Sequence, residues 1–95
     1  MVLATFQIDG SFKLTGRGLV IYGDITSGTV RNENFISFQN RGQQLKLKIK
    51  SIEMMDRIED EISKVSFLFY YENDAQKEIL EILRVEKQTA TITEA

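Results

Sequence analysis

The 95-residue sequence contains no cysteine and no histidine. Without cysteine, neither a disulfide framework, a thiolate nucleophile nor a thiolate metal site can form. Without histidine, the chain lacks the side chain best suited to acid–base catalysis near neutral pH and the commonest nitrogen ligand of zinc. An enzyme would have to use carboxylates, lysines, serines and tyrosines alone, and no pair of these has a recognisable acid–base spacing. We therefore predict a non-catalytic protein with no metal site and no cofactor.

Excess charge of one sign and long apolar runs are also absent. Twelve basic and 14 acidic side chains give a net charge of −2, so no overall field draws in a polyanion. The first nine residues lack the basic start and apolar stretch of a signal peptide, and nowhere do about 18 apolar residues follow one another. We predict a soluble, cytoplasmic protein without membrane contact, built as one domain over residues 1–95.

Short stretches of strand-forming residues alternate with turn signals through the first 42 residues. The polar residues 9–11 predict a turn between two strands, and residues 39–42 predict another. Gly23 lies inside a strand-like stretch, which indicates a bulge or a close contact with a neighbouring strand. The predicted strands in this part cover residues 2–8, 12–14, 19–25 and 35–38.

Residues 45–50 show the clearest periodicity, because an aliphatic residue and a lysine alternate strictly. A strand with this pattern has one buried and one exposed face. Residues 64–71 predict a second strong strand with apolar groups on both faces, so something covers its outer side. Its inner set is either Val65, Phe67 and Phe69 or the alternate set Leu68 and Tyr70.

Two later segments are ambiguous. Residues 51–62 have apolar residues near helical spacing, yet they continue directly from a strand. Residues 74–83 begin with Asp74, a good helix cap, and carry apolar residues at helical spacing. Alternation returns over residues 85–93. We expect a short helical turn after Asp74, followed by a closing strand.

Glycines at positions 16, 18, 23 and 28 punctuate the strand-like run over residues 12–30. With Phe6 and Ile8 before it and Ile36 and Phe38 after it, this spacing resembles the second domain of elongation factor Tu and related translation GTPases. The resemblance implies an all-β fold: a single closed antiparallel barrel of about six strands, with Greek-key-like connections and one short helical turn. For residues 51–62 it favours a strand that runs into a loop.

Two residues depart from that family pattern. Leu19 stands where the family usually has threonine after Gly-Arg-Gly, and Glu33 takes the place of a usual turn glycine. The family's GTPase domain is not in this sequence, so the resemblance implies no nucleotide hydrolysis. In the family the barrel docks a neighbouring domain and a macromolecular ligand, which implies a binding module.

In elongation factor Tu, the segment that matches residues 53–57 helps to hold the aminoacylated 3′ end of tRNA. Glu53 and Met54 match the family, whereas Met55 replaces a flat side chain on which a base stacks. Asp56 places a negative charge where a positive one would face phosphate, and Arg57 follows one position later. Because stacking contributes about 1–3 kcal/mol per base, these changes argue against an inherited tRNA-end site.

Gly16-Arg17-Gly18 superficially resembles a phosphate-binding loop. It lacks the lysine and the serine or threonine of the Walker pattern, and it also lacks the glycine spacing of the dinucleotide fingerprint. We expect the glycines to make turns and Arg17 to pair with a carboxylate.

The lysines of residues 45–50, together with Arg41 and Lys64, predict a basic stripe on one face. A solvated strand face that resists aggregation is the simpler interpretation, since a nucleic-acid surface usually interleaves such charge with exposed aromatic residues. The acidic residues 53, 56 and 59–61 follow, with a spacing that fits no calcium loop. The stripe and the acidic cluster also offer complementary charges for self-association.

Tyr70 and Tyr71 end the second strong strand, and tyrosine is common at protein interfaces. We predict that they contact a protein partner or a second copy of the chain. The alternative is binding of single-stranded nucleic acid or a tRNA end through the basic strand and its adjoining loops. The candidate contacts for this alternative are Arg17, Lys46, Lys48, Lys50, Glu53 and Arg57.

Overall fold

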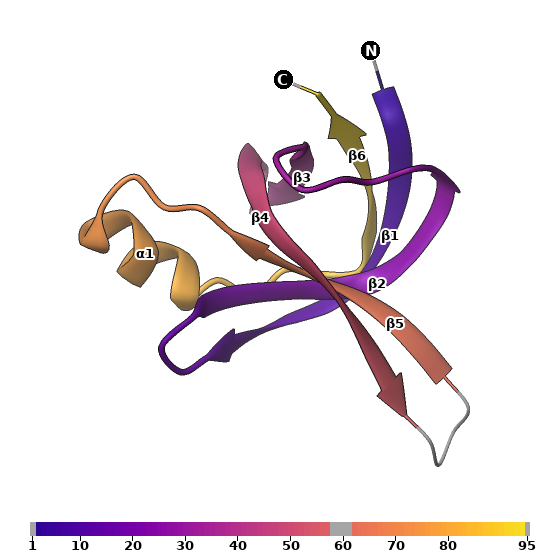
Figure 1. Cartoon of the computed structure of the whole chain (residues 1–95). Coiled ribbons are helices and arrows are strands. Elements are labelled where there is room, and N and C mark those ends of the chain that lie inside the picture. Colours follow the sequence, from indigo (N-terminus) through magenta and orange to yellow (C-terminus); the bar gives the residue numbers. More distant parts are fainter. Residues whose placement is uncertain (1, 58–61, 95) are drawn as a thin grey trace.

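Strands with alternating side chains form the wall of a closed antiparallel barrel (Figure 1). The computed structural model describes the backbone of residues 2–57 and 62–94, and the side chains of residues 2–54 and 64–94. Within this part of the chain, six strands close in the order β1-β2-β5-β4-β3-β6. The predicted all-β class and barrel are confirmed. The strands are β1 (Val2–Leu14), β2 (Gly18–Gly28), β3 (Phe35–Asn40), β4 (Gln43–Arg57), β5 (Ile62–Phe69) and β6 (Gln88–Thr93).

The inward side chains of the strands fill the barrel and form one core. Phe6 of β1 and Phe67 of β5 lie at its centre, with ring centroids 4.5 Å apart. On β4 the predicted alternation is confirmed, because Leu47 and Ile49 are buried and the lysines between them are exposed. Each fully buried side chain of this size contributes about 1.5–3 kcal/mol, so the pattern of apolar residues fixes the register of each strand.

The inner set of β5 is Val65, Phe67 and Phe69, the first of the two predicted alternatives. Leu68 faces the outer side, yet only 3% of it is exposed. It pairs with Val20 of β2, which is also buried outside the core, and Val20 pairs with Phe12 of β1. The second apolar face of β5 is therefore part of an apolar row on the outside of the barrel.

The first strand differs from the prediction. A turn was expected at residues 9–11, but β1 continues through them, and only its register with β2 shifts between Ile8 and Gly10. The absent side chain of Gly10 leaves room for the ring of Tyr22, since a Cβ there would lie 2.7 Å from the Tyr22 hydroxyl. The Asp9-Gly10 signal thus produces a bulge within one strand, because both flanking segments pair with β2.

Gly23 makes the predicted close contact with a neighbouring strand. It pairs with Ile8, and a Cβ at this position would collide with the carbonyl oxygen of Gln7. Any side chain here would push β1 and β2 apart, which explains a glycine in the middle of a strand.

The ambiguous segment after residue 50 is strand as far as the structure describes it. β4 continues to Arg57 and pairs with β5, with a register shift between Ile49 and Ser51. The shift makes Lys50 the extra residue of a β-bulge in β4. The predicted loop and helical turn at 58–61 lie outside the described residues.

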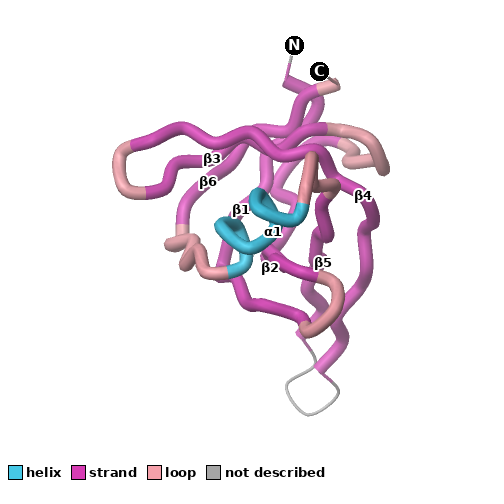
Figure 2. The backbone as a smooth tube through the Cα atoms, turned by 90° about the vertical axis from the view of Figure 1, so that its left-hand side faces the viewer, coloured by secondary structure: helices cyan, strands magenta, loops and turns pink. Residues whose placement is uncertain are grey.

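The segment after β5 forms helix α1 (Asp74–Glu81), which is longer than the single turn expected. Its N-cap is Asn73, one residue before the predicted cap, and the Asn73 side chain accepts a hydrogen bond from the Gln76 backbone. Leu80 of α1 and the following Val85 join the barrel core, and in Figure 2 the helix lies in front of the ring of strands. No helix in the described ranges has the length and apolar character needed to cross a bilayer.

The last strand closes the ring between β1 and β3 and starts at Gln88, slightly later than expected. Val2 pairs with Thr93, so the two ends of the chain lie side by side (Figures 1 and 2).

Candidate functional site

Three lysines and two aromatic rings alternate on the outer face of β3, β4 and the end of β5. Phe35 lies directly opposite Lys48 across the β3–β4 pair, and the Tyr70 backbone N–H donates to the Lys48 carbonyl. The ammonium groups of Lys46 and Lys48 lie 5.0 and 6.0 Å from the centroid of Phe35. Those of Lys48 and Lys50 lie 5.5 and 6.0 Å from the centroid of Tyr70. We call this series the aromatic–lysine ladder: Lys46, Phe35, Lys48, Tyr70 and Lys50.

The strict alternation of β4 creates this ladder, because it places all three lysines on one face. The turn between β3 and β4 then sets which residue stands opposite. Arg41 and Gly42 both have positive φ angles, 51° and 80°, as a two-residue type I′ turn requires. This tight turn fixes the register that brings Phe35 to Lys48.

Glu33 holds the middle of the ladder in place. Its carboxylate accepts a hydrogen bond of 2.6 Å from the Tyr70 hydroxyl and pairs with the Lys48 ammonium at 3.2 Å. The hydrogen bond from Tyr70 lowers the pKa of Glu33, and Lys48 acts in the same direction. The same bond raises the pKa of Tyr70.

Glu33 itself has a φ angle of 75°, in the left-handed region that favours glycine. A glutamate in this conformation costs more than a glycine would, and such strain is common where a side chain has a function. Here the glutamate side chain orients Tyr70 and Lys48.

Tyr71, the second predicted protein contact, has a different environment from Tyr70. Its ring packs against the core, and its hydroxyl accepts a hydrogen bond of 2.8 Å from the Leu19 backbone. Burial raises the pKa of Tyr71. Tyr70, in contrast, is 42% exposed. The exposed member of the predicted pair is therefore Tyr70, while Tyr71 joins the end of β5 to β2.

Arg17 and Glu53, which stand 36 residues apart in the sequence, form an ion pair of 3.3 Å on the outer surface. The expected carboxylate partner of Arg17 is thus Glu53. Met54 faces the other side of β4, opposite Val65, and is 63% exposed. The side chains of residues 55–57, including the predicted contact Arg57, lie outside the described ones.

Tyr70 separates two hollows in the surface. The Arg17 hollow, of about 350 Å³, is lined by Arg17, Lys50, Tyr70, Tyr71, Asp74 and Lys77 among others. The Phe35 hollow, of about 250 Å³, has Phe35, Lys46, Lys48, Tyr70 and Gln76 in its lining. The ladder therefore borders both hollows, and residues of α1 line the other side of each.

A third hollow lies away from the ladder. The Arg84 hollow, of about 870 Å³, is lined by Arg41, Arg84, Glu86 and Lys87 together with polar residues, and no aromatic side chain borders it. It contains Arg41, which the sequence grouped with the basic stripe. It thus offers positive charge without a stacking surface.

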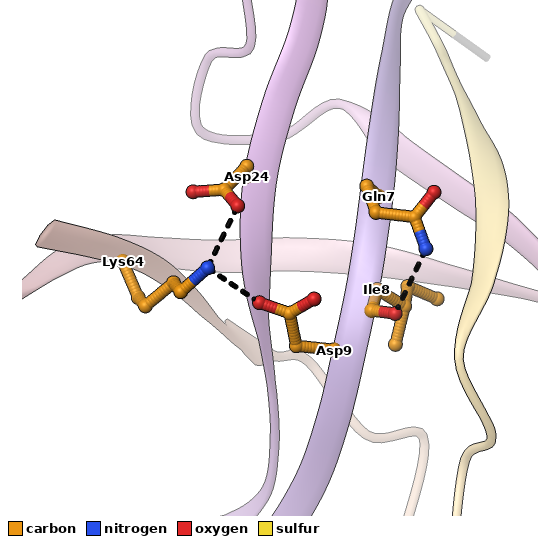
Figure 3. Close-up of polar contacts among 5 residues, drawn as sticks. All are labelled: Gln7, Ile8, Asp9, Asp24 and Lys64. Atoms are coloured by element: carbon orange, nitrogen blue, oxygen red, sulfur yellow. Dashed lines mark hydrogen bonds and ion pairs between the residues drawn. The ribbon is translucent and has the colours of Figure 1, made fainter. Parts of the chain in front are cut away.

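Lys64, also grouped with the basic stripe, is held by carboxylates instead (Figure 3). Its ammonium lies 2.7 Å from Asp9 at the β1 bulge and 2.8 Å from Asp24 on β2. Hydrogen bonds to Asp24 and Asp9 raise the pKa of Lys64. This cluster joins three strands and does not extend the ladder.

Sequence reasoning missed Phe35 and Glu33 as members of the ladder and its support, and it missed Lys77 in the lining of the Arg17 hollow. Phe35 could be found from the two-residue turn at positions 41 and 42, which sets the β3–β4 register. Lys77 depends on where α1 packs, and no local pattern indicates that.

No cluster of three or more metal-ligating side chains occurs among the residues that the structure describes. The chain matches no family model, no curated protein and no solved structure.

Proposed function

We propose that the chain is a non-catalytic binding module that holds single-stranded nucleic acid on the aromatic–lysine ladder. The observation that carries the proposal is the alternation of ammonium groups and rings along β4, with distances of 5.0–6.0 Å. Proteins that bind single strands combine a positively charged groove for the backbone with aromatic rings on which bases stack. The ladder supplies both on one face of the barrel and borders two hollows.

The net charge of −2 does not argue against such a site. At physiological ionic strength, charges more than about 8 Å apart are largely screened from each other in solvent. A phosphate on β4 therefore senses mainly the three lysines, Glu33 and Glu72, which also lines the Phe35 hollow. Glu33 pairs with Lys48 at 3.2 Å and so offsets the charge of Lys48. Lys46 and Lys50 form no ion pair within the described residues, so their charge is available to phosphates.

Stacking adds a contribution that charge alone cannot supply. A base on Tyr70 or Phe35 would gain about 1–3 kcal/mol by stacking, whatever its identity. The Glu33 hydrogen bond restricts the Tyr70 ring before a ligand arrives, so less conformational entropy is lost on binding. We expect little sequence preference and a Kd of about 10⁻⁶–10⁻⁴ M at physiological salt.

We also propose that the barrel is of the type found in the second domain of elongation factor Tu. The closed six-strand barrel supports this, and so does the ion pair between Arg17 and Glu53, two residues of the matching motifs. Glu33 adds a third argument, since it stands at the position of a usual turn glycine of the family and has a positive φ, a conformation that favours glycine.

The test is fluorescence polarisation with a short labelled single strand, as RNA and as DNA, compared with the same sequence as a duplex. The single strands should bind more tightly than the duplex, and their affinity should fall steeply with salt. Light scattering with and without the strand gives the mass of the complex in parallel.

The same light-scattering data test the predicted protein docking. A salt-resistant dimer that ignores both strands would overturn the nucleic-acid proposal and favour self-association. A monomer that gains the mass of the strand at low salt would support the ladder as the binding surface.

A further inference from the structure

The Arg17 hollow gathers positive charge from three separate elements at one end of the ladder. Arg17 comes from the β1–β2 turn, Lys50 from β4 and Lys77 from α1. Asp74 also lines the hollow and Glu53 pairs with Arg17, so three positive charges stand against two negative ones. Lys50 belongs to both the ladder and the hollow, which makes the two surfaces continuous.

We propose that this hollow binds a phosphate monoester, namely the terminal phosphate of a strand that lies on the ladder. The inference rests on the proposed function and adds which part of the strand is recognised. A terminal phosphate carries about −1.5 to −2 charges at pH 7. Lys50 and Lys77 form no ion pair within the described residues, so two ammonium groups are available to that dianion, whereas a phosphodiester carries a single charge.

The residues that line the hollow also favour binding of the end of a nucleic-acid strand over binding of its interior. A strand that follows β4 from Lys46 to Lys50 reaches the turn at residues 15–17 and the start of α1, which both line the hollow. Tyr70 borders the hollow on the ladder side, so the terminal base can stack on its ring while the phosphate lies among the cations.

Lys77 is available for such a contact. Within the described residues its ammonium has no ion pair, and Arg17 uses one N–H group on Glu53, leaving other donors of its guanidinium. Arginine and lysine together would give a planar fork and a point charge on the same phosphate.

The Arg84 hollow provides a matched comparison. It also contains three cations, Arg41, Arg84 and Lys87, and one carboxylate, Glu86. It has no aromatic wall and shares no lining residue with the ladder, so it offers at least as much positive charge without the stacked base that would bring the phosphate in.

The experiment compares three labelled single strands of one sequence, with a free 5′ hydroxyl, a 5′ phosphate or a 3′ phosphate, by fluorescence polarisation at low salt. One of the two phosphorylated strands should bind about tenfold more tightly than the unmodified strand, and which one reveals the strand direction. Lys77→Gln should remove this preference while changing the affinity for the unmodified strand by less than about twofold. Lys87→Gln, with the same change in net charge, should keep the preference.

Equal affinities for the three strands, or a preference that survives Lys77→Gln combined with Arg17→Gln, would overturn this inference and leave the proposed function intact. Failure of all three strands to bind would overturn both. A titration with inorganic phosphate followed by NMR should shift the amide signals of residues 16–17 and 77 before those of residues 84–87. The reverse order would contradict the assignment of the hollow.

Discussion

Lysines on two neighbouring strands of this barrel have opposite surroundings. Lys64 on β5 lies between two carboxylates at 2.7 and 2.8 Å, and only 28% of its side chain is exposed. On β4, Lys46 and Lys50 lie over aromatic rings, and neither pairs with a carboxylate in the described part of the chain. The two carboxylates neutralise the charge of Lys64 and link it to neighbouring strands. The aromatic rings leave the charge of Lys46 and Lys50 available to a ligand. The surroundings, and not the residue type, therefore separate a lysine that joins strands from one whose charge remains available to the proposed ligand.

The largest expected effect on single-strand affinity comes from removing the three lysines of the ladder. Replacing Lys46, Lys48 and Lys50 together by glutamine should weaken single-strand binding at low salt by about 100-fold or more. Because Lys48 is paired with Glu33, the slope of log K against log salt should become shallower by about 1.4, at about 0.7 for each of the contacts made by Lys46 and Lys50. Fluorescence polarisation over a salt series measures both quantities.

The matched control replaces Arg41, Arg84 and Lys87 by glutamine. Both triple variants change the net charge from −2 to −5, since each removes three positive charges. Similar losses of affinity in both variants would show that overall charge, and not the ladder, attracts the strand.

The rings of the ladder should have the next largest effect. Tyr70→Leu and Phe35→Leu keep apolar volume but remove the stacking surface, so each should weaken binding by about tenfold with little change in the salt slope. Tyr70→Phe keeps the ring and loses only the hydrogen bond to Glu33, so it should reduce the affinity for the single strand much less than Tyr70→Leu does. If Tyr70→Leu binds as tightly as the unmodified protein, base stacking on this ring is ruled out.

Lys64 should affect stability and leave binding unchanged. Lys64→Met removes the cation between Asp9 and Asp24, so the two carboxylates repel each other and the Tm should fall by a few degrees. Thermal unfolding followed by circular dichroism measures this change. Adding Asp24→Asn should restore part of the Tm, because one of the repelling charges disappears. A loss of strand affinity in folded Lys64→Met would break the contrast between the two groups of lysines.

The smallest effect concerns pH. The pKa of Glu33 is lowered from its ordinary value of 4.5, so the folded state prefers the charged carboxylate. Its contribution to stability is present above pH 4.5 and is lost as the pH falls through the lower folded-state pKa. At high pH, Tyr70 should lose its proton later than an ordinary tyrosine with a pKa of 10.0.

An ultraviolet titration of tyrosinate formation, compared between the unmodified protein and Glu33→Gln, tests this link. The variant should ionise one tyrosine at a lower pH than the unmodified protein does. Identical titration curves would show that Glu33 does not hold the Tyr70 hydroxyl in solution.

The sequence predicted those parts of the fold that depend on local pattern. On β4 the alternation gave the inward leucines and the outward lysines, because a strand with one buried face tolerates no slip in register. The turn predicted at residues 9–11 was wrong, because Tyr22 lies over Gly10 and Lys64 binds Asp9, and both partners are distant in sequence. A local turn signal cannot show that the flanking segments pair with the same neighbour.

The candidate site was predictable only in part for the same reason. The three lysines were evident, but the rings between them come from β3 and from the end of β5. The place of Tyr70 depends on the register shift between Ile49 and Ser51, which no residue pattern announces. Glu33 was expected to be a departure from a turn glycine, and its role appears only with Tyr70 and Lys48 beside it.

The pairing of Val2 with Thr93 makes the barrel suitable as an insertable cassette. Because both ends leave the same rim, the unit can be placed within a surface loop of a host protein without separating the two host segments. The ladder would then be presented on a different scaffold with its geometry unchanged.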